Sequence, residues 1–232
     1  MDQHTTLQVN DLSMAYLERG DGPTIIALHA ATANSIQMGW LTRLIVHEGF
    51  NVVAPDQRGH GKTRNPADDL HLPRLVDDLL EFTYLLGRSP LHGIGYSMGG
   101  AVLLYTARRR PDLFRSLILL GTSFRAPTPQ RIQSAVGPLD EADKGPRRVF
   151  DPETGIVVGW DEPVEAFAGV TCPTLIITGD RDEFIDPAEN LALYNTLPNA
   201  ELLIIPRCDH LGLVRHPLLT HSLTDFYSHI PR

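Results

Sequence analysis

The chain has 232 residues, of which 42% are hydrophobic, so it can bury a sizeable core within a single domain. Its formal net charge of −8 argues against nucleic-acid partners, because contacts to phosphates need a basic surface. We expect no membrane span and no signal peptide, since there is no apolar run of about 18 residues and no basic stretch followed by an apolar one at the start.

Cysteine usage bears on the compartment. The two cysteines, Cys172 and Cys208, form no CxxC motif. Such a sparse set is typical of a reducing compartment and provides no disulfide framework. We therefore expect a cytoplasmic protein.

The first quarter of the chain alternates predicted strands with a helix. Residues 7–13 and 14–20 are predicted as an opening pair of strands around a polar turn. Residues 24–30 and 51–56 are near-continuous apolar runs, as expected of strands buried on both faces. Between these runs, residues 35–49 are predicted to form a helix.

The middle of the chain continues the alternation. Residues 72–87 carry apolar side chains at spacings of three and four, which predicts a helical face. Residues 91–97 are predicted as a strand that ends in a tight turn, and residues 98–110 as the helix that follows it. A further strand is predicted over residues 116–122.

The last third of the chain predicts strands over residues 174–180 and 201–206, and helices over residues 187–197 and 217–230. Alternation of this kind implies an α/β fold with a mostly parallel central sheet and helices on both faces. Ligands in such sheets bind at the carboxyl ends of the strands.

One segment, residues 123–170, breaks this alternation, because it holds prolines and charges and few apolar residues. We expect it to form a small cap inserted into a core made of residues 1–122 and 171–232; the alternative is a long surface loop. Within the segment, residues 147–160 are predicted to form a hairpin.

Ser97 is the predicted nucleophile. Gly95-Tyr96-Ser97-Met98-Gly99 matches G-x-S-x-G between a predicted strand and a predicted helix. A tight turn in that context exposes the serine hydroxyl and directs a helix N-terminus at the site. A dinucleotide-binding loop is excluded, because Met98 stands where G-x-G-x-x-G needs its third glycine.

A neutral serine needs a base within hydrogen-bond reach, and the base needs an acid to orient it. His210 is the predicted base, because it follows the last strand at the sheet edge where Ser97 is expected. The loop after the preceding strand supplies the acid, with Asp182 as first choice and Asp180 as runner-up.

Five stretches spanning residues 24–217 resemble the α/β-hydrolase superfamily, particularly its small bacterial esterases, lactonases and C–C hydrolases. They are ALHAATANS, DQRGHGKT, GYSMGG, PTLIITGDRD and IPRCDHLGLVRHP. In this family the acid ends a G-x-x-D pattern, which matches Asp182, and the family histidine matches His210. The resemblance also implies an oxyanion hole formed by the backbone N–H groups of Ala31 and Met98.

The chain departs from the family pattern in two places. Ala30 follows His29, where most relatives have a glycine, and the cap is shorter than in most relatives. A short cap implies either a shallow, open pocket or a pocket that another subunit closes. A homo-oligomer is therefore one of the two alternatives. Trp160 and Phe167 are expected either to line the substrate pocket or to pack the cap onto the core.

These observations predict a serine hydrolase that cleaves a small carboxylic ester or lactone through an acyl-enzyme on Ser97. Neither a metal nor another cofactor is implied, and the expected partner is a small-molecule substrate. Alternatives on the same triad are C–C bond hydrolysis, thioester hydrolysis and perhydrolysis, and a further alternative is a ligand-binding member without turnover. Dehalogenase and epoxide hydrolase chemistry needs a carboxylate nucleophile, which Ser97 excludes.

Overall fold

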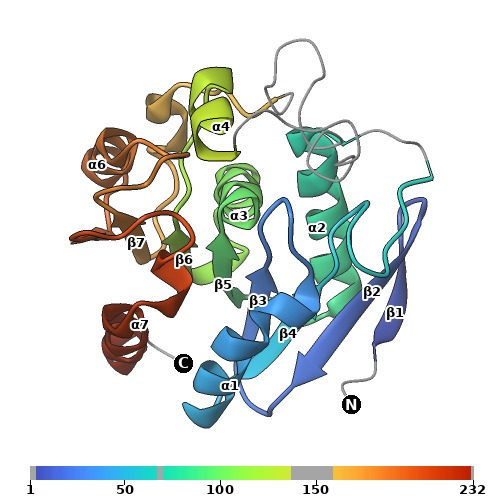
Figure 1. Cartoon of the computed structure of the whole chain (residues 1–232). Helices are drawn as coiled ribbons and strands as arrows, with labels where there is room; N and C mark the ends of the chain where they lie inside the picture. Colours follow the sequence, from blue (N-terminus) through green and yellow to red (C-terminus); the bar gives the residue numbers. More distant parts are fainter. Residues whose placement is uncertain (1–3, 67–69, 137–158, 231–232) are drawn as a thin grey trace.

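The computed structural model describes residues 4–66, 70–136 and 159–230. Within them, one eight-stranded sheet has the order β1-β2-β4-β3-β5-β6-β7-β8 (Figure 1). The strands are β1 (Thr5–Val9), β2 (Leu12–Arg19), β3 (Thr24–Leu28), β4 (Asn51–Pro55), β5 (Leu91–Tyr96), β6 (Phe114–Leu120), β7 (Thr174–Gly179) and β8 (Ala200–Ile205). β1 and β2 pair antiparallel, β2 pairs antiparallel with β4, and the other neighbours are parallel.

Helices cover both faces of the sheet. The helices are α1 (Gly39–His47), α2 (Leu72–Leu86), α3 (Met98–Arg109), α4 (Pro129–Val136), α6 (Pro187–Thr196) and α7 (Pro217–His229), and single 3-10 turns occupy Ser35–Met38, Val164–Phe167 and Leu213–Arg215. Helices α2, α3 and α6 contribute to one core, and α1 and α7 to the other.

The central strands carry apolar side chains toward both cores. On β6, Leu117 and Leu119 belong to the core beside α3, whereas Ile118 and Leu120 belong to the core beside α7. Alternate side chains of a strand point to opposite faces, so a strand between two helical layers must be apolar throughout. This confirms the predicted α/β class with its mostly parallel sheet.

Several boundaries differ from the prediction. The opening strands were predicted to meet at residues 13 and 14, but the turn between them lies at Asn10 and Asp11. The helix predicted from residue 35 begins as the 3-10 turn, and the side chains and backbones of Asn34 and Gln37 cap each other there. The strand predicted to end at residue 122 ends at Leu120, because Gly121 takes a φ of +50° and turns the chain.

The cap prediction is only partly covered by the structure. Helix α4 follows β6, and the turn Val164–Phe167 precedes β7. Residues 137–158 lie outside the described part, and with them most of the predicted hairpin at 147–160. The division into core and cap therefore stays a prediction. No helix among the described residues combines the length and the apolar character that crossing a bilayer requires.

Candidate active site

The direction in which strands are added to the sheet reverses at β3. From β3 the chain proceeds to β4 on one side and then returns to place β5 on the other side of β3. In open α/β sheets, ligands bind at the carboxyl ends of the strands where the order reverses. The loop after β3 carries Ala30 and Ala31, and β5 ends directly before Ser97.

Ser97 sits in the strained turn that the motif predicts. Its φ of 53° and ψ of −120° are unfavourable for a residue with a Cβ, and its backbone N–H donates to the carbonyl of Leu120 at 2.8 Å. The side chain is partly exposed, while its neighbours Tyr96 and Met98 are buried. The turn therefore presents the hydroxyl at the surface of the sheet edge.

Glycine is required beside this turn because α3 passes very close to β3. A Cβ at Gly99 would lie 2.4 Å from the carbonyl oxygen of Leu28, well inside van der Waals contact. The first backbone N–H groups of a helix have no partner within the helix. The N–H of Met98, at the start of α3, is therefore suited to receive a developing negative charge.

His210 and Asp182 form a buried pair. Nδ1 of His210 lies 2.7 Å from Oδ2 of Asp182, and the other carboxylate oxygen of Asp182 accepts from the backbone N–H groups of Phe184 and Ile185 at 3.0 and 2.8 Å. The two residues are only 5% and 4% exposed. Because a carboxylate can only accept, the neutral form of the imidazole carries its proton on Nδ1 and has its lone pair on Nε2.

Asp180 does not reach the imidazole. Its carboxylate accepts from the backbone N–H of Cys208 at 3.2 Å, which joins the loops after β7 and β8. Of the two acids considered from the sequence, the structure brings Asp182 to His210. The catalytic role of Asp182 stays a prediction.

Ser97 and His210 are brought to the same edge of the sheet. Tyr96, the residue before Ser97, stacks on the His210 imidazole with ring centroids 5.1 Å apart. Among the described residues, no hydrogen bond joins the Ser97 hydroxyl to His210. Catalytic hydrogen bonds in ligand-free sites are often formed only when substrate binds, so this pairing also stays a prediction.

The loop after β3 is held by a histidine of defined tautomer. Nε2 of His29 accepts from the backbone N–H of Gln57 at 3.0 Å, so Nδ1 carries the proton and donates to the Ala30 carbonyl at 2.8 Å. Burial, with the neighbouring His60 adding to it, lowers the pKa of His29 to about 4, which keeps the ring neutral. The carbonyl of Ala30 shares its peptide plane with the N–H of Ala31, so His29 orients the predicted oxyanion donor.

Ala30 is compatible with this loop. Outside glycine, the described residues adopt a positive φ only at Asn10, Ser97 and Arg207. Ala30 therefore takes a backbone conformation that any residue can adopt, and its departure from the glycine of most relatives requires no left-handed strain.

The turn at residues 56–61 orders the loops around the site. The buried carboxylate of Asp56 accepts from the backbone N–H groups of Ser35 and Lys62 at 2.7 and 2.8 Å. His60 lies with one ring nitrogen 2.7 Å from the carbonyl oxygen of Ala31, which ties the turn to the loop after β3. Arg58 is fully buried and bonds the carboxylate of Asp78.

Trp160 and Phe167 lie inside the core beside α3. Trp160 is 2% exposed and donates its indole N–H to the carbonyl of Ser123 at 3.0 Å. Phe167 has no exposed surface and packs edge-on against Tyr105. These contacts are those of core packing, and a contact with substrate stays a prediction.

Sequence reasoning missed Arg131 on α4. Its guanidinium donates to the carbonyl oxygens of Asp182 and Glu183 at 3.3 and 3.4 Å, and to the Asp186 carboxylate at 2.6 Å. The segment after β6 is thereby tied to the loop that holds the predicted acid. Nothing local in the sequence marks this residue, because its partners lie more than fifty positions away.

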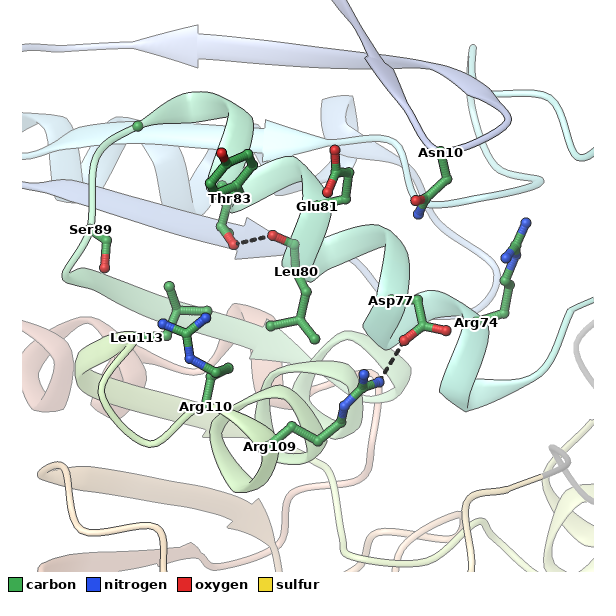
Figure 2. A pocket seen from close by; sticks show the side chains of 12 residues that line it. Asn10, Arg74, Asp77, Leu80, Glu81, Thr83, Ser89, Arg109, Arg110 and Leu113 are labelled. Atoms are coloured by element: carbon green, nitrogen blue, oxygen red, sulfur yellow. Dashed lines mark hydrogen bonds and ion pairs between the residues drawn. The ribbon is translucent and has the colours of Figure 1, made fainter.

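A groove of about 800 Å³ lies elsewhere, between α2 and the end of α3 (Figure 2). Its lining includes Ser89 and Leu113, which precede β5 and β6, so it lies at the amino ends of these strands and not at the edge that carries Ser97. The ion pair of Asp77 and Arg109 lies in it, and its other two arginines also pair with aspartates. Across the described residues, no three histidine, cysteine or acidic side chains gather as metal ligands would.

Comparison with known proteins identifies relatives of the chain. Residues 23–151, more than half of the chain, match the family model described as the alpha/beta hydrolase fold. Epoxide hydrolase 3 of Siraitia grosvenorii is 30% identical over 53% of the chain, and the chain spans only 40% of its length. The 2-(acetamidomethylene)succinate hydrolase of Mesorhizobium japonicum is 21% identical, and the match covers 95% of the chain and 93% of that protein.

Solved structures share the fold over nearly the whole chain. A meta-cleavage product hydrolase from Pseudomonas fluorescens superposes with a TM-score of 0.81 at 17% identity, covering 98% of each chain. A 2-hydroxy-6-oxo-6-phenylhexa-2,4-dienoate hydrolase from a Rhodococcus strain has a TM-score of 0.80 at 20% identity, covering 98% of this chain and 99% of that one. At this identity the likeness shows the fold alone.

Proposed function

Since this chain belongs to the α/β-hydrolase family, we propose that it is a serine hydrolase that cleaves a small carboxylic ester or lactone through an acyl-enzyme on Ser97. The observation that carries the proposal is the buried pair of His210 and Asp182, 2.7 Å apart, beside the strained turn at Ser97. An imidazole oriented by a carboxylate, next to a partly exposed serine, is the arrangement that activates a serine.

In the first step, the Ser97 oxygen attacks the carbonyl carbon and its proton passes to Nε2 of His210. Asp182 stabilises the resulting imidazolium through Nδ1. The electron pair of the carbonyl moves onto its oxygen, which accepts hydrogen bonds from the N–H groups of Met98 and Ala31. Each such preorganised donor contributes roughly 3–4 kcal/mol to the stability of the transition state.

In the second step, the tetrahedral intermediate collapses and the C–O bond of the ester breaks. His210 gives its proton to the departing alkoxide, so the alcohol leaves neutral and the acyl group remains on Ser97. Water then attacks the acyl carbon while His210 takes a proton from it, the bond between the acyl carbon and the Ser97 oxygen breaks, and His210 returns the proton to that oxygen as the acid is released.

The residue at the nucleophile position separates this proposal from epoxide hydrolysis, the activity by which one relative is named. Opening an epoxide by that route needs a carboxylate nucleophile, and Ser97 is a hydroxyl. C–C bond hydrolysis is the second candidate, because meta-cleavage product hydrolases share the fold over 98% of the chain.

Ester hydrolysis is tested with short p-nitrophenyl esters, followed by the absorbance of the released phenolate. The wild-type protein should turn these over, and Ser97→Ala should lower kcat at least about 10⁴-fold. Ser222→Ala, which removes a hydroxyl from the surface of α7, is the matched control and should retain full activity. Full activity in Ser97→Ala would show that another group is the nucleophile.

The substrate class is tested with a panel of esters, lactones, thioesters and vinylogous diketones under the same conditions. A value of kcat/KM for diketones well above that for esters would replace the ester proposal with C–C bond hydrolysis. Absence of turnover together with tight binding of a panel compound would identify a ligand-binding member of the family.

A further inference from the structure

We propose that Tyr96 is the positioning residue for the base: its side chain sets where the His210 imidazole lies relative to Ser97. This inference rests on the proposed function, because it concerns the same nucleophile and base. Tyr96 occupies the first variable position of the G-x-S-x-G motif, so it belongs to the strand that delivers the nucleophile.

Two contacts connect Tyr96 to the base. Its hydroxyl donates to the backbone carbonyl of His210 at 2.9 Å. Its ring stacks on the imidazole, with centroids 5.1 Å apart and planes inclined by 28°. Both side chains are buried, so neither contact competes with bulk water.

The Tyr96 hydroxyl is a donor of fixed role. A carbonyl oxygen can only accept, so the phenol must keep its proton to make this bond. Burial, followed by the negative charge of Asp182, raises the pKa of Tyr96 well above its usual value. Burial thus favours the protonated phenol that this bond requires.

Three further contacts of His210 come from the loop after β7. Asp182 holds one edge of the ring at Nδ1, the side chain of Glu183 accepts from the backbone N–H of His210 at 3.2 Å, and the Phe184 ring packs on the imidazole with centroids 4.9 Å apart. Among the contacts described for His210, those from Tyr96 come from the strand that carries Ser97.

Through these contacts, the strand that carries Ser97 also holds the proposed base. A tyrosine side chain has only two rotatable bonds before the ring, and here the ring is packed and the hydroxyl bonded. Misplacement of a reacting group by about 1 Å can lower a rate about a hundredfold. Tyr96 thus transmits the position of the strained turn directly to the imidazole.

The test compares Tyr96→Phe with a matched control. Phenylalanine keeps the stacked ring and removes only the hydroxyl. Tyr105→Phe makes the same change at another buried tyrosine, whose hydroxyl donates to the carbonyl of Phe124 at 2.7 Å and touches neither Ser97 nor His210. Each variant is treated with an excess of a fluorophosphonate, and the rate constant for labelling Ser97 is measured by mass spectrometry.

Labelling reports the activation of the serine, because its oxygen forms the bond to phosphorus, fluoride leaves, and the imidazole takes the hydroxyl proton. The variants are labelled well below their melting temperatures, so that the folded fraction is close to one and does not enter the observed rate constant. We expect Tyr96→Phe to label about tenfold more slowly than wild type, and to show a similar fall in kcat for ester hydrolysis with KM unchanged. Tyr105→Phe should label at the wild-type rate even where its melting temperature falls.

Equal labelling rates for Tyr96→Phe and Tyr105→Phe would overturn the positioning role, and so would a change confined to KM. If Tyr96→Phe does not yield folded protein, Tyr96→Leu, which removes the ring as well as the hydroxyl, takes its place under the same criteria, with Tyr105→Leu as its control. A wild-type protein that is not labelled at Ser97 at all would overturn the proposed function itself, which distinguishes the two failures.

Discussion

Ser97 lies in a strained turn and is partly exposed, and contacts from surrounding residues hold the turn in place. Its φ of 53° is unfavourable for a serine, and the backbone bond to Leu120 helps to hold it there. The acid–base pair is equally specified, because both oxygens of Asp182 are occupied, one by His210 and the other by two backbone N–H groups. The Ser97 backbone and the Asp182 carboxylate are therefore both held by specific hydrogen bonds.

The partners of Asp182 and Asp180 predict different consequences for two similar substitutions. Asp182→Asn replaces an oxygen that accepts from Nδ1 with a group that can donate, which favours the wrong imidazole tautomer. We expect kcat for ester hydrolysis to fall about 10⁴-fold with little change in KM.

Asp180→Asn is the control, because it keeps an oxygen that can accept from the N–H of Cys208. We expect a loss of less than about tenfold there, since only the loop contact is weakened. Steady-state kinetics on both variants decides the matter, and a larger loss in Asp180→Asn would transfer the role of the acid to that residue.

At the scale of elements, the site depends on how closely β3, β5 and α3 approach one another. The turn at Ser97 brings the start of α3 against the end of β3, with the Gly99 Cα close to the backbone of Leu28. That approach brings the start of α3 against the backbone of Leu28 and His29, which lie shortly before Ala31 in the chain. We therefore expect the close packing of α3 on β3 to bring the two predicted oxyanion donors together.

Glycine at position 99 should accordingly be irreplaceable. Gly99→Ala would place a Cβ 2.4 Å from the Leu28 carbonyl oxygen, so α3 must shift. We expect a loss of about 1–3 kcal/mol in the free energy of unfolding, together with reduced activity. Urea titration followed by circular dichroism measures the first of these.

Gly39→Ala is the matched control for that substitution. Gly39 begins α1, and a Cβ there would meet nothing within 4 Å. Alanine favours helix more than glycine does, so we expect stability to be unchanged or to rise by up to about 1 kcal/mol. Equal destabilisation by both substitutions would contradict the role assigned to close packing at Gly99.

For the molecule as a whole, burial of neutral histidines makes stability depend on pH. Burial, with the charge of Arg115 second, lowers the pKa of His92 to about 4, and His29 has a pKa of about 4 for the reasons given above. Below the unfolded value near 6.5, the unfolded chain binds protons that the folded chain does not. Stability is therefore fully present above pH 6.5 and is lost as the pH falls toward 4.

His92 is the better test of this effect, because it lies at the start of β5, away from Ser97. Its imidazole packs on Phe50 and Tyr227, so phenylalanine can replace it among aromatic rings. We expect His92→Phe to remove a part of the acid destabilisation, on the order of 3 kcal/mol between pH 6.5 and 4.

Melting temperatures measured across that pH range check the prediction. His47→Phe, which alters an exposed histidine at the end of α1, is the control and should leave the pH dependence as in wild type. A wild-type slope in His92→Phe would mean that other groups govern the acid lability.

Local patterns in the sequence were sufficient for the elements and for the candidate residues at their ends. Apolar runs predicted the parallel strands, because a strand buried on both faces must be apolar throughout. The turn motif at Ser97 was recognisable because strain and close packing require glycines at fixed neighbouring positions. The strand predicted over residues 116–122 was placed two residues too late, since the turn at Gly121 depends on a backbone angle that the residue permits but does not require.

The sequence by itself thus determined the α/β class and predicted Ser97, His210 and Asp182 as candidates at the strand ends, because these follow from periodicity, from turn chemistry and from the order of the elements. Tertiary structure added that the first-choice acid Asp182, and not the runner-up Asp180, contacts the imidazole, that Tyr96 contacts His210 and that Arg131 holds the acid loop. It also decided that Trp160 and Phe167 are buried. The physical reason is that these contacts join positions far apart in the chain. A local stretch of sequence does not indicate which distant residue a side chain will contact after folding.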